Sequence, residues 1–88
     1  MSEPQPPRVV VVTRPGCHLC ENAVAVIRTV CAEQDTTYTE RDITDDADLT
    51  RRYGDQIPVT FVDGAQHDFW RVDADRLRAA LTGRRRGR

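Results

Sequence analysis

An α/β fold, with a four-stranded mixed sheet flanked by helices, is predicted by three features of this sequence. The chain has 88 residues, 39% hydrophobic and 31% charged, which suits one domain because a second would leave neither part enough chain to bury a core. A β-branched run near the N-terminus is followed by a segment of helical period. An Asp-Gly pair between two later apolar segments predicts an antiparallel hairpin. The predicted order of elements is β-α-β-α-β-β-α.

The first half of the chain predicts two strands joined by a helix. Residues 8–13 contain four consecutive valines and no polar alternation, as expected of a strand covered on both faces. After a Pro-Gly turn, apolar residues recur at three- and four-residue steps, which predicts a helix over about 17–33. Residues 37–43 predict the second strand. Because a helix joins the two strands, they should be parallel in a right-handed unit.

The middle of the chain predicts a short helix and a third strand. Thr44 or Asp45 is a candidate cap for this helix, which should end near Tyr53, with Gly54 in a left-handed conformation. Pro58 then opens a strand at 59–62.

The last part of the chain predicts a hairpin and a helix. The turn at 63–64 should join the third strand to an antiparallel segment around 67–72. Phe61 and at least one of Phe69 and Trp70 should fill the core of the sheet. Asp73 should cap a final helix that continues through Leu81 and stops at Gly83, with Leu77 and Leu81 as its buried stripe.

The two ends of the chain differ from its body. We divide the chain into a disordered N-terminal tail over residues 1–7, a domain over 8–83 and a basic disordered C-terminal tail over 84–88. Four of the 13 basic residues lie in that last segment, but a short terminal run of this kind is typically solvated, so no nucleic acid partner is expected. No apolar run approaches the roughly 20 residues of a membrane span, so no membrane partner is expected either.

The cysteine content indicates a reducing compartment. Three cysteines are too few and too unevenly spaced for the disulfide framework of a small secreted protein. We therefore expect a cytoplasmic monomer in which a close pair of cysteines is catalytic, redox-sensing or metal-binding.

Cys17 and Cys20 are the candidate catalytic residues. Three positions apart at the start of a helix, they lie one turn from each other, close enough for a reversible disulfide. Cys17 faces the unpaired N–H groups and the positive end of the helix, which favour a thiolate. Arg14 and His18 can add positive charge. The pattern predicts thiol–disulfide exchange, with Cys17 as the nucleophile and Cys20 as the resolving cysteine.

Residues 12–20 and 56–59 resemble the active-site segments of glutaredoxin-like proteins of the thioredoxin superfamily. The resemblance extends from Val9 to about Leu81 and implies a thioredoxin-like fold. It also implies a cis bond between Ile57 and Pro58, contact of Pro58 with the cysteines, and a substrate-binding backbone at Val59.

The chain departs from glutaredoxins proper in one segment. Where those proteins carry a double glycine and acidic residues that hold glutathione, this chain has residues 71–75, without the glycines. We therefore expect no bound cofactor, and either a low-molecular-weight thiol or a protein reductase as electron donor. The partner would be a disulfide-bearing protein or a small-thiol mixed disulfide.

Two other functions compete with the enzyme. Cys17 and Cys20 could supply half of a zinc or iron–sulfur site, but Cys31 lies roughly 16 Å farther along the helix and cannot join them. A lone His67 near the fourth strand is more typical of a surface residue than of a ligand, so we name no metal-binding residue beyond the pair. The pair could also act in a redox-sensing or binding module without turnover.

Overall fold

The computed structural model of the chain describes the backbone of residues 7–86 and the side chains of residues 7–82. Its elements follow the predicted order. They are β1 (Val9–Thr13), α1 (His18–Glu33), β2 (Tyr38–Asp42), α2 (Ala47–Tyr53), β3 (Val59–Val62), β4 (Ala65–Phe69) and α3 (Ala74–Arg86). The strands form one sheet in the order β2-β1-β3-β4, with β1 parallel to β2 and antiparallel to β3, and β3 antiparallel to β4. The predicted mixed four-stranded sheet is confirmed.

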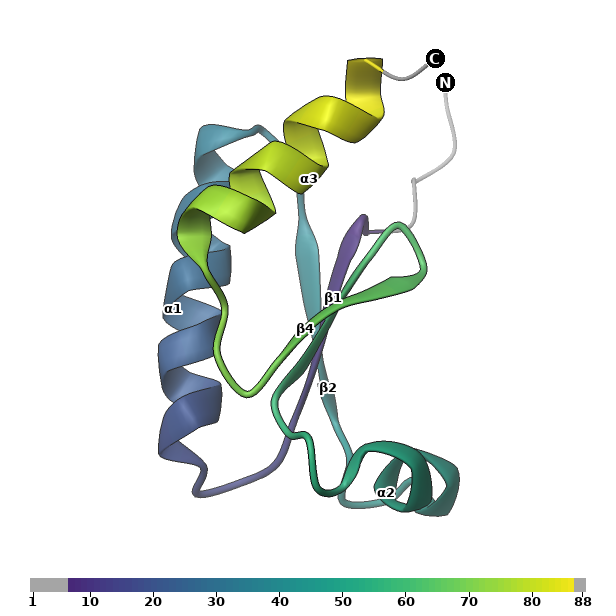
Figure 1. Cartoon of the computed structure of the whole chain (residues 1–88). Coiled ribbons are helices and arrows are strands. Elements are labelled where there is room, and N and C mark those ends of the chain that lie inside the picture. The colour runs from purple at the N-terminus through teal and green to yellow at the C-terminus, as the bar shows by residue number, and fades with distance from the viewer. Residues whose placement is uncertain (1–6, 87–88) are drawn as a thin grey trace, which may run out of the picture.

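Helices cover both faces of the sheet, with α1 and α3 on one side and α2 at one end of the other (Figure 1). Alternate residues of β1 supply the two faces, because successive side chains of a strand point in opposite directions. Val9 and Val11 pack with α1 and α3, whereas Val12 packs in a smaller cluster with Cys20 and Ile57. The smaller cluster therefore connects the sheet directly to the predicted cysteine site.

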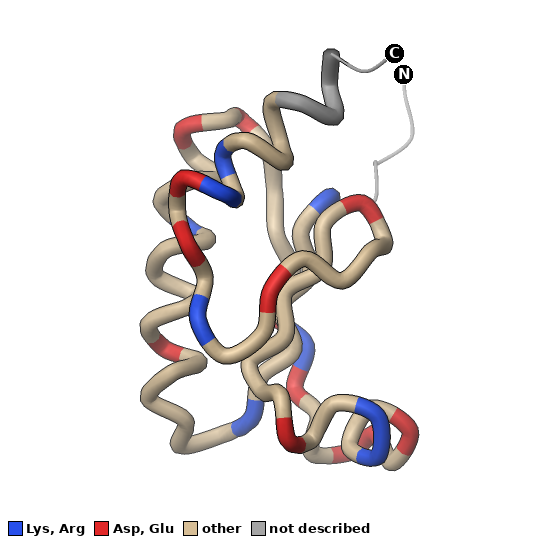
Figure 2. The backbone as a smooth tube through the Cα atoms, viewed as in Figure 1, with Lys and Arg blue, Asp and Glu red and all other residues tan. Residues whose placement is uncertain are grey.

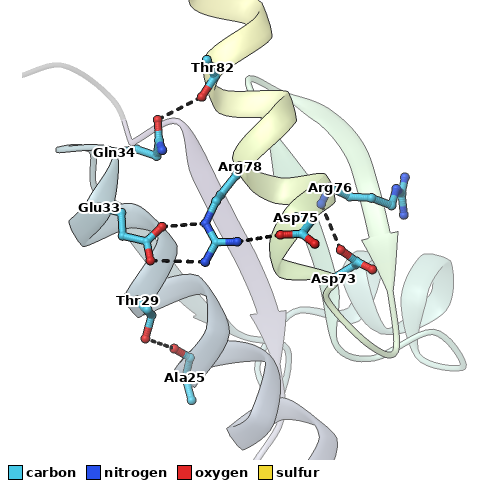
Figure 3. Close-up of polar contacts among 9 residues, drawn as sticks. All are labelled: Ala25, Thr29, Glu33, Gln34, Asp73, Asp75, Arg76, Arg78 and Thr82. Atoms are coloured by element: carbon cyan, nitrogen blue, oxygen red, sulfur yellow. Dashed lines mark hydrogen bonds and ion pairs between the residues drawn. The ribbon is translucent and has the colours of Figure 1, made fainter.

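Polar contacts also join α1 to α3 along their exposed sides (Figure 3). The Arg78 guanidinium donates to Glu33 at 2.6 Å and to Asp75 at 2.7 Å, and the Thr82 hydroxyl donates to Gln34 at 3.1 Å. The pKa of Glu33 is lowered, chiefly by its hydrogen bond with Arg78. These groups are in solvent, which screens their attraction, so the buried leucines of α3 hold the two helices together more strongly.

Two predicted details of α2 are wrong. The residue that caps the helix is Asp46, whose carboxylate accepts a hydrogen bond from the Leu49 N–H at 3.0 Å, and not Thr44 or Asp45. Gly54 has φ −53°, so it is right-handed rather than left-handed. A Cβ at Gly54 would lie 2.6 Å from the Thr50 carbonyl oxygen, so glycine is needed here because the two backbone segments lie close together.

The C-terminal elements also differ from their predicted bounds. Asp73 accepts a hydrogen bond from the Arg76 N–H at 3.0 Å, as its predicted capping role requires, but α3 passes through Gly83 and continues to Arg86. Most of the predicted disordered tail at 84–88 is therefore helical, and residues 87–88 lie outside the described part. Of the predicted N-terminal tail, residues 1–6 lie outside it as well.

The aromatic prediction is wrong for the end of the hairpin. Phe69 is 46% exposed and Trp70 is 52% exposed, so neither fills the core. Phe61 alone is half-buried, and its ring meets Tyr53 edge-on at a centroid distance of 5.5 Å. The core is built instead from small aliphatic side chains and the leucines of α3.

Candidate active site

The cysteine pair lies at the junction between β1 and α1. The strand ends at Thr13, and the turn that follows contains Gly16 with φ +73°, a left-handed conformation that glycine adopts without strain. The helix then begins at His18, with Cys17 as its N-cap residue in an extended conformation. This turn therefore places Cys17 at the positive end of a 16-residue helix.

Cys17 is partly exposed and acts as the cap of its own helix. Its sulfur accepts a hydrogen bond from the Cys20 backbone N–H at 3.1 Å. This contact satisfies one of the N–H groups that a helix N-terminus leaves unpaired. A thiolate accepts such a bond better than a thiol does, because hydrogen bonds to an ionised acceptor are the stronger ones. The geometry thus places a hydrogen-bond donor and the positive end of α1 at the Cys17 sulfur.

Cys20, in contrast, lies in a buried environment. Its side chain is 4% exposed, and the pKa of its thiol is raised to about 12. Burial is the largest cause, and the hydrogen bond with Cys17 and its charge add to it, while the Arg14 backbone N–H and the Arg14 charge act in the opposite direction. One sulfur is thus open to a substrate and the other is protonated and shielded.

The two predicted activating residues lie at the site but in different settings. The Arg14 side chain reaches the end of α2, where it donates to the Gly54 carbonyl oxygen at 3.0 Å. Its backbone N–H and charge act on Cys20. The His18 side chain is 95% exposed, and its Nδ1 lies 3.8 Å from a Glu21 carboxylate oxygen. Solvent at this position screens a histidine charge.

The segment from Ile57 to Val59 lies against the pair. The Ile57–Pro58 peptide bond is cis, and Ile57 and Val59 share a core cluster with Cys20, against which Cys17 packs. Val59 pairs with β1 on one side and β4 on the other, so its backbone lies inside the sheet. Ile57 precedes the strand, and no backbone hydrogen bond to it is present in the described part of the chain. The Ile57 backbone, unlike that of Val59, is therefore not part of the sheet.

A cavity of about 340 Å³ opens beside the two cysteines. Arg14 and both cysteines line one end, and charged residues of α1 and β2 line the rest, among them Glu21, Arg28 and Glu40. Glu40 accepts a hydrogen bond from the buried Thr13 hydroxyl at 3.3 Å. The cavity thus borders the cysteine pair with charged side chains of both signs.

No group of three or more His, Cys, Asp or Glu side chains that could hold a metal ion occurs among the described residues. Cys31 is 2% exposed and packs in the cluster between α1 and α3, and burial raises its pKa. His67 lies on β4, with Nε2 at 3.9 Å from an Asp68 carboxylate oxygen. Neither residue extends the cysteine pair into a four-ligand site.

Sequence reasoning missed the place of Trp70. Its backbone N–H donates to the Pro58 carbonyl oxygen at 2.7 Å, and its indole Nε1 donates to the Asp55 carbonyl oxygen at 3.0 Å. Both acceptors lie in the segment between α2 and β3. The sequence feature that could have pointed to Trp70 is the aromatic pair of Phe69 and Trp70, which directly precedes residues 71–75, where the double glycine is missing.

Residues 8–82 match the family model described as Glutaredoxin-like domain (DUF836). The chain belongs to this glutaredoxin-like family. Together with the cysteine pair at the start of α1, membership indicates a redox role.

Two relatives are similar in sequence, and the second is similar in fold as well. An uncharacterized protein of Mycobacterium tuberculosis (strain ATCC 25618 / H37Rv) is 32% identical over 80 residues, covering 85% of this chain and 82% of its own. A protein of Nitrosomonas europaea, with a solution NMR structure, is 31% identical with a TM-score of 0.74, covering 92% of this chain and 98% of its own.

More distant structures share the fold of this glutaredoxin-like chain. The thioredoxin of Fasciola hepatica superposes with a TM-score of 0.56 over 85% of this chain and 77% of its own, at 19% identity. The predicted thioredoxin-like fold is therefore confirmed. No described helix is long and apolar enough to cross a membrane.

Proposed function

We propose that this glutaredoxin-like protein is a thiol–disulfide oxidoreductase in which Cys17 attacks a substrate disulfide and Cys20 resolves the product. The observation that supports this most strongly is the asymmetry of the pair. Cys17 is partly exposed at a helix N-terminus with a hydrogen bond to its sulfur, whereas Cys20 is buried with its pKa raised to about 12. An attacking and a resolving thiol require these two environments.

The first step transfers the substrate to the protein. The Cys17 thiolate attacks one sulfur of the substrate disulfide, the substrate S–S bond breaks, and its electron pair leaves on the second sulfur, which takes a proton from water. The protein is then in a mixed disulfide with the substrate through Cys17. Ile57 offers a backbone N–H and carbonyl beside this new bond.

The second step closes the internal disulfide. In the mixed disulfide Cys17 no longer carries a charge, so two of the effects that raise the pKa of Cys20, its hydrogen bond with Cys17 and the Cys17 charge, are removed. The Arg14 backbone N–H still acts in favour of the thiolate. Cys20 then loses its proton to solvent and attacks the Cys17 sulfur, which releases the second substrate thiol. A thiol reductant, either a low-molecular-weight thiol or a protein reductase, returns the protein to the dithiol state.

The direct test is a single-turnover reaction. Reduced, metal-free protein is mixed with a peptide disulfide, and the products are identified by mass spectrometry. We expect one equivalent of reduced peptide per chain and an internal Cys17–Cys20 disulfide. Oxidation of the pair without release of reduced peptide would indicate a redox sensor, and failure of the pair to oxidise would contradict the proposal.

Alkylation across pH should separate the three thiols. With iodoacetamide on the reduced protein, Cys17 should react first. Cys20 should stay slow through neutral pH, and its rate should rise about tenfold for each unit of increase in pH up to its pKa of about 12. Cys31 should also lag, because burial raises its pKa. Mass spectrometry of each cysteine-containing peptide gives the rates. In denaturant all three should react alike; equal rates in the folded protein would contradict the assignment.

A further inference from the structure

The loop between β4 and α3 holds Trp70 in a constrained and half-exposed position. Its φ is +65°, in a region that bulky side chains rarely occupy. Hydrogen bonds from its backbone N–H to the Pro58 carbonyl and from its indole to the Asp55 carbonyl hold it there, and Phe69 meets its ring edge-on at 5.0 Å. Such strain persists only where the surroundings fix it, and it gathers at functional sites.

Trp70 forms one wall of a groove beside the cysteine pair. The groove has a volume of about 220 Å³ and lies between α1 and the loop that carries Trp70. Its lining residues come from the loop, α1 and the position between the two cysteines. They are Leu19, Asn22, Ala23, Val26, Trp70, Arg71 and Val72. The lining is thus mostly apolar, with one uncharged polar residue, Asn22, and one charged residue, Arg71.

We propose that this groove binds the substrate polypeptide itself, by taking a large apolar side chain that lies close to the substrate cysteine and is accompanied by an acidic residue. This inference rests on the proposed function and names its substrate class. Trp70 is then the residue that determines specificity.

The size and course of the groove favour a polypeptide over a small thiol. Its volume is below the roughly 300–1,000 Å³ of typical small-molecule pockets, but it suits one apolar side chain. No cysteine lines it, and from Leu19 to Val26 it follows α1 for roughly 10 Å. An occupant bonded to Cys17 must therefore continue past Leu19, which the residues flanking a cysteine in a peptide can do.

The charge at the edge of the groove supports the acidic residue in the substrate. Arg71 is exposed, and no ion pair involving it is present in the described part of the chain. Asn22, the other polar lining residue, carries no charge. A carboxylate placed beside Arg71 would meet a guanidinium without competition from a neighbouring acid, whereas a lysine there would be repelled.

The test uses the Cys20→Ser chain and short peptides, each with one cysteine joined to thionitrobenzoate. The Cys17 thiolate attacks the peptide sulfur, the disulfide breaks, and the coloured thionitrobenzoate anion leaves with the electron pair. One peptide has leucine and glutamate beside its cysteine, a second has serine in place of leucine, and a third has lysine in place of glutamate. We expect the first to react about tenfold faster than the second and several-fold faster than the third.

Trp70→Gly is the decisive variant, because glycine adopts the positive φ without strain. It should reduce the preference for leucine to within about twofold, and its rate with iodoacetamide, measured in parallel, corrects for any change in the reactivity of Cys17 itself. Phe69→Tyr is the matched control, since Phe69 is almost equally exposed but does not line the groove, and tyrosine keeps a ring against Trp70, so this variant should keep the preference.

The fluorescence of the single tryptophan gives a second readout. Its emission should shift to shorter wavelength in the adduct with the leucine peptide and stay unchanged with the serine peptide. Equal rates for all peptides would overturn the docking inference while leaving disulfide exchange intact. So would a Trp70-dependent preference for a small-thiol disulfide, such as cystine, over every peptide. No reaction with any disulfide would instead contradict the proposed function.

Discussion

Cys20→Ser should convert the protein into a trap that holds its substrate. Cys17 keeps its position at the start of α1, so attack on a disulfide proceeds, but no second thiol is in place to displace the product. We expect one equivalent of mixed disulfide per chain at Cys17, stable until an external thiol is added. Mass spectrometry under non-reducing conditions measures it.

Cys17→Ser should have the opposite result, with exchange reduced to the uncatalysed rate. Cys20 is 4% exposed and protonated well above neutral pH, so it cannot replace the missing nucleophile. Cys31→Ala serves as the control, because this thiol is buried between α1 and α3 and should not participate. Two results would contradict the assignment of roles: turnover by Cys17→Ser, or release of product by Cys20→Ser at the rate of the unchanged protein.

The parts of this site that the sequence predicted depend on local signals. The β-branched run of β1, the Pro-Gly turn and the helical period after Cys17 each fix structure within a few residues, so strand, turn and helix start all lie where they were expected. The shielding of Cys20 follows from the same periodicity, because its position faces the sheet.

The parts that the sequence did not predict depend on distant contacts. Hydrophobicity predicted at least one of Phe69 and Trp70 in the core, but both are exposed, and Trp70 donates a hydrogen bond to the Pro58 carbonyl, twelve positions earlier. Gly83 was expected to end α3, yet the helix continues beyond it. Glycine permits a helix end but does not require one. Composition and spacing alone do not specify such contacts between distant residues.

Leu77→Ala should cause a large loss of stability. Leu77 is fully buried and packs α3 against α1 and the sheet. Removing such a side chain costs about 2–5 kcal/mol through lost burial and the cavity left behind. A chain of this length is typically stable by only about 4–13 kcal/mol, so urea unfolding should shift to a much lower midpoint.

Two control variants separate the loss of buried side-chain volume from a general effect on α3. Leu77→Met nearly conserves volume and should cost less than about 1.5 kcal/mol, and Ala79→Ser at an exposed position of the same helix should cost less than about 0.5 kcal/mol. Leu77 belongs to the cluster on the face of α1 and α3, whereas Cys20 belongs to the smaller cluster. The folded Leu77→Ala protein should therefore alkylate at Cys17 at an unchanged rate. A large change in that rate would show that the site depends on the packing of α3, and a loss of less than about 1 kcal/mol would contradict the packing itself.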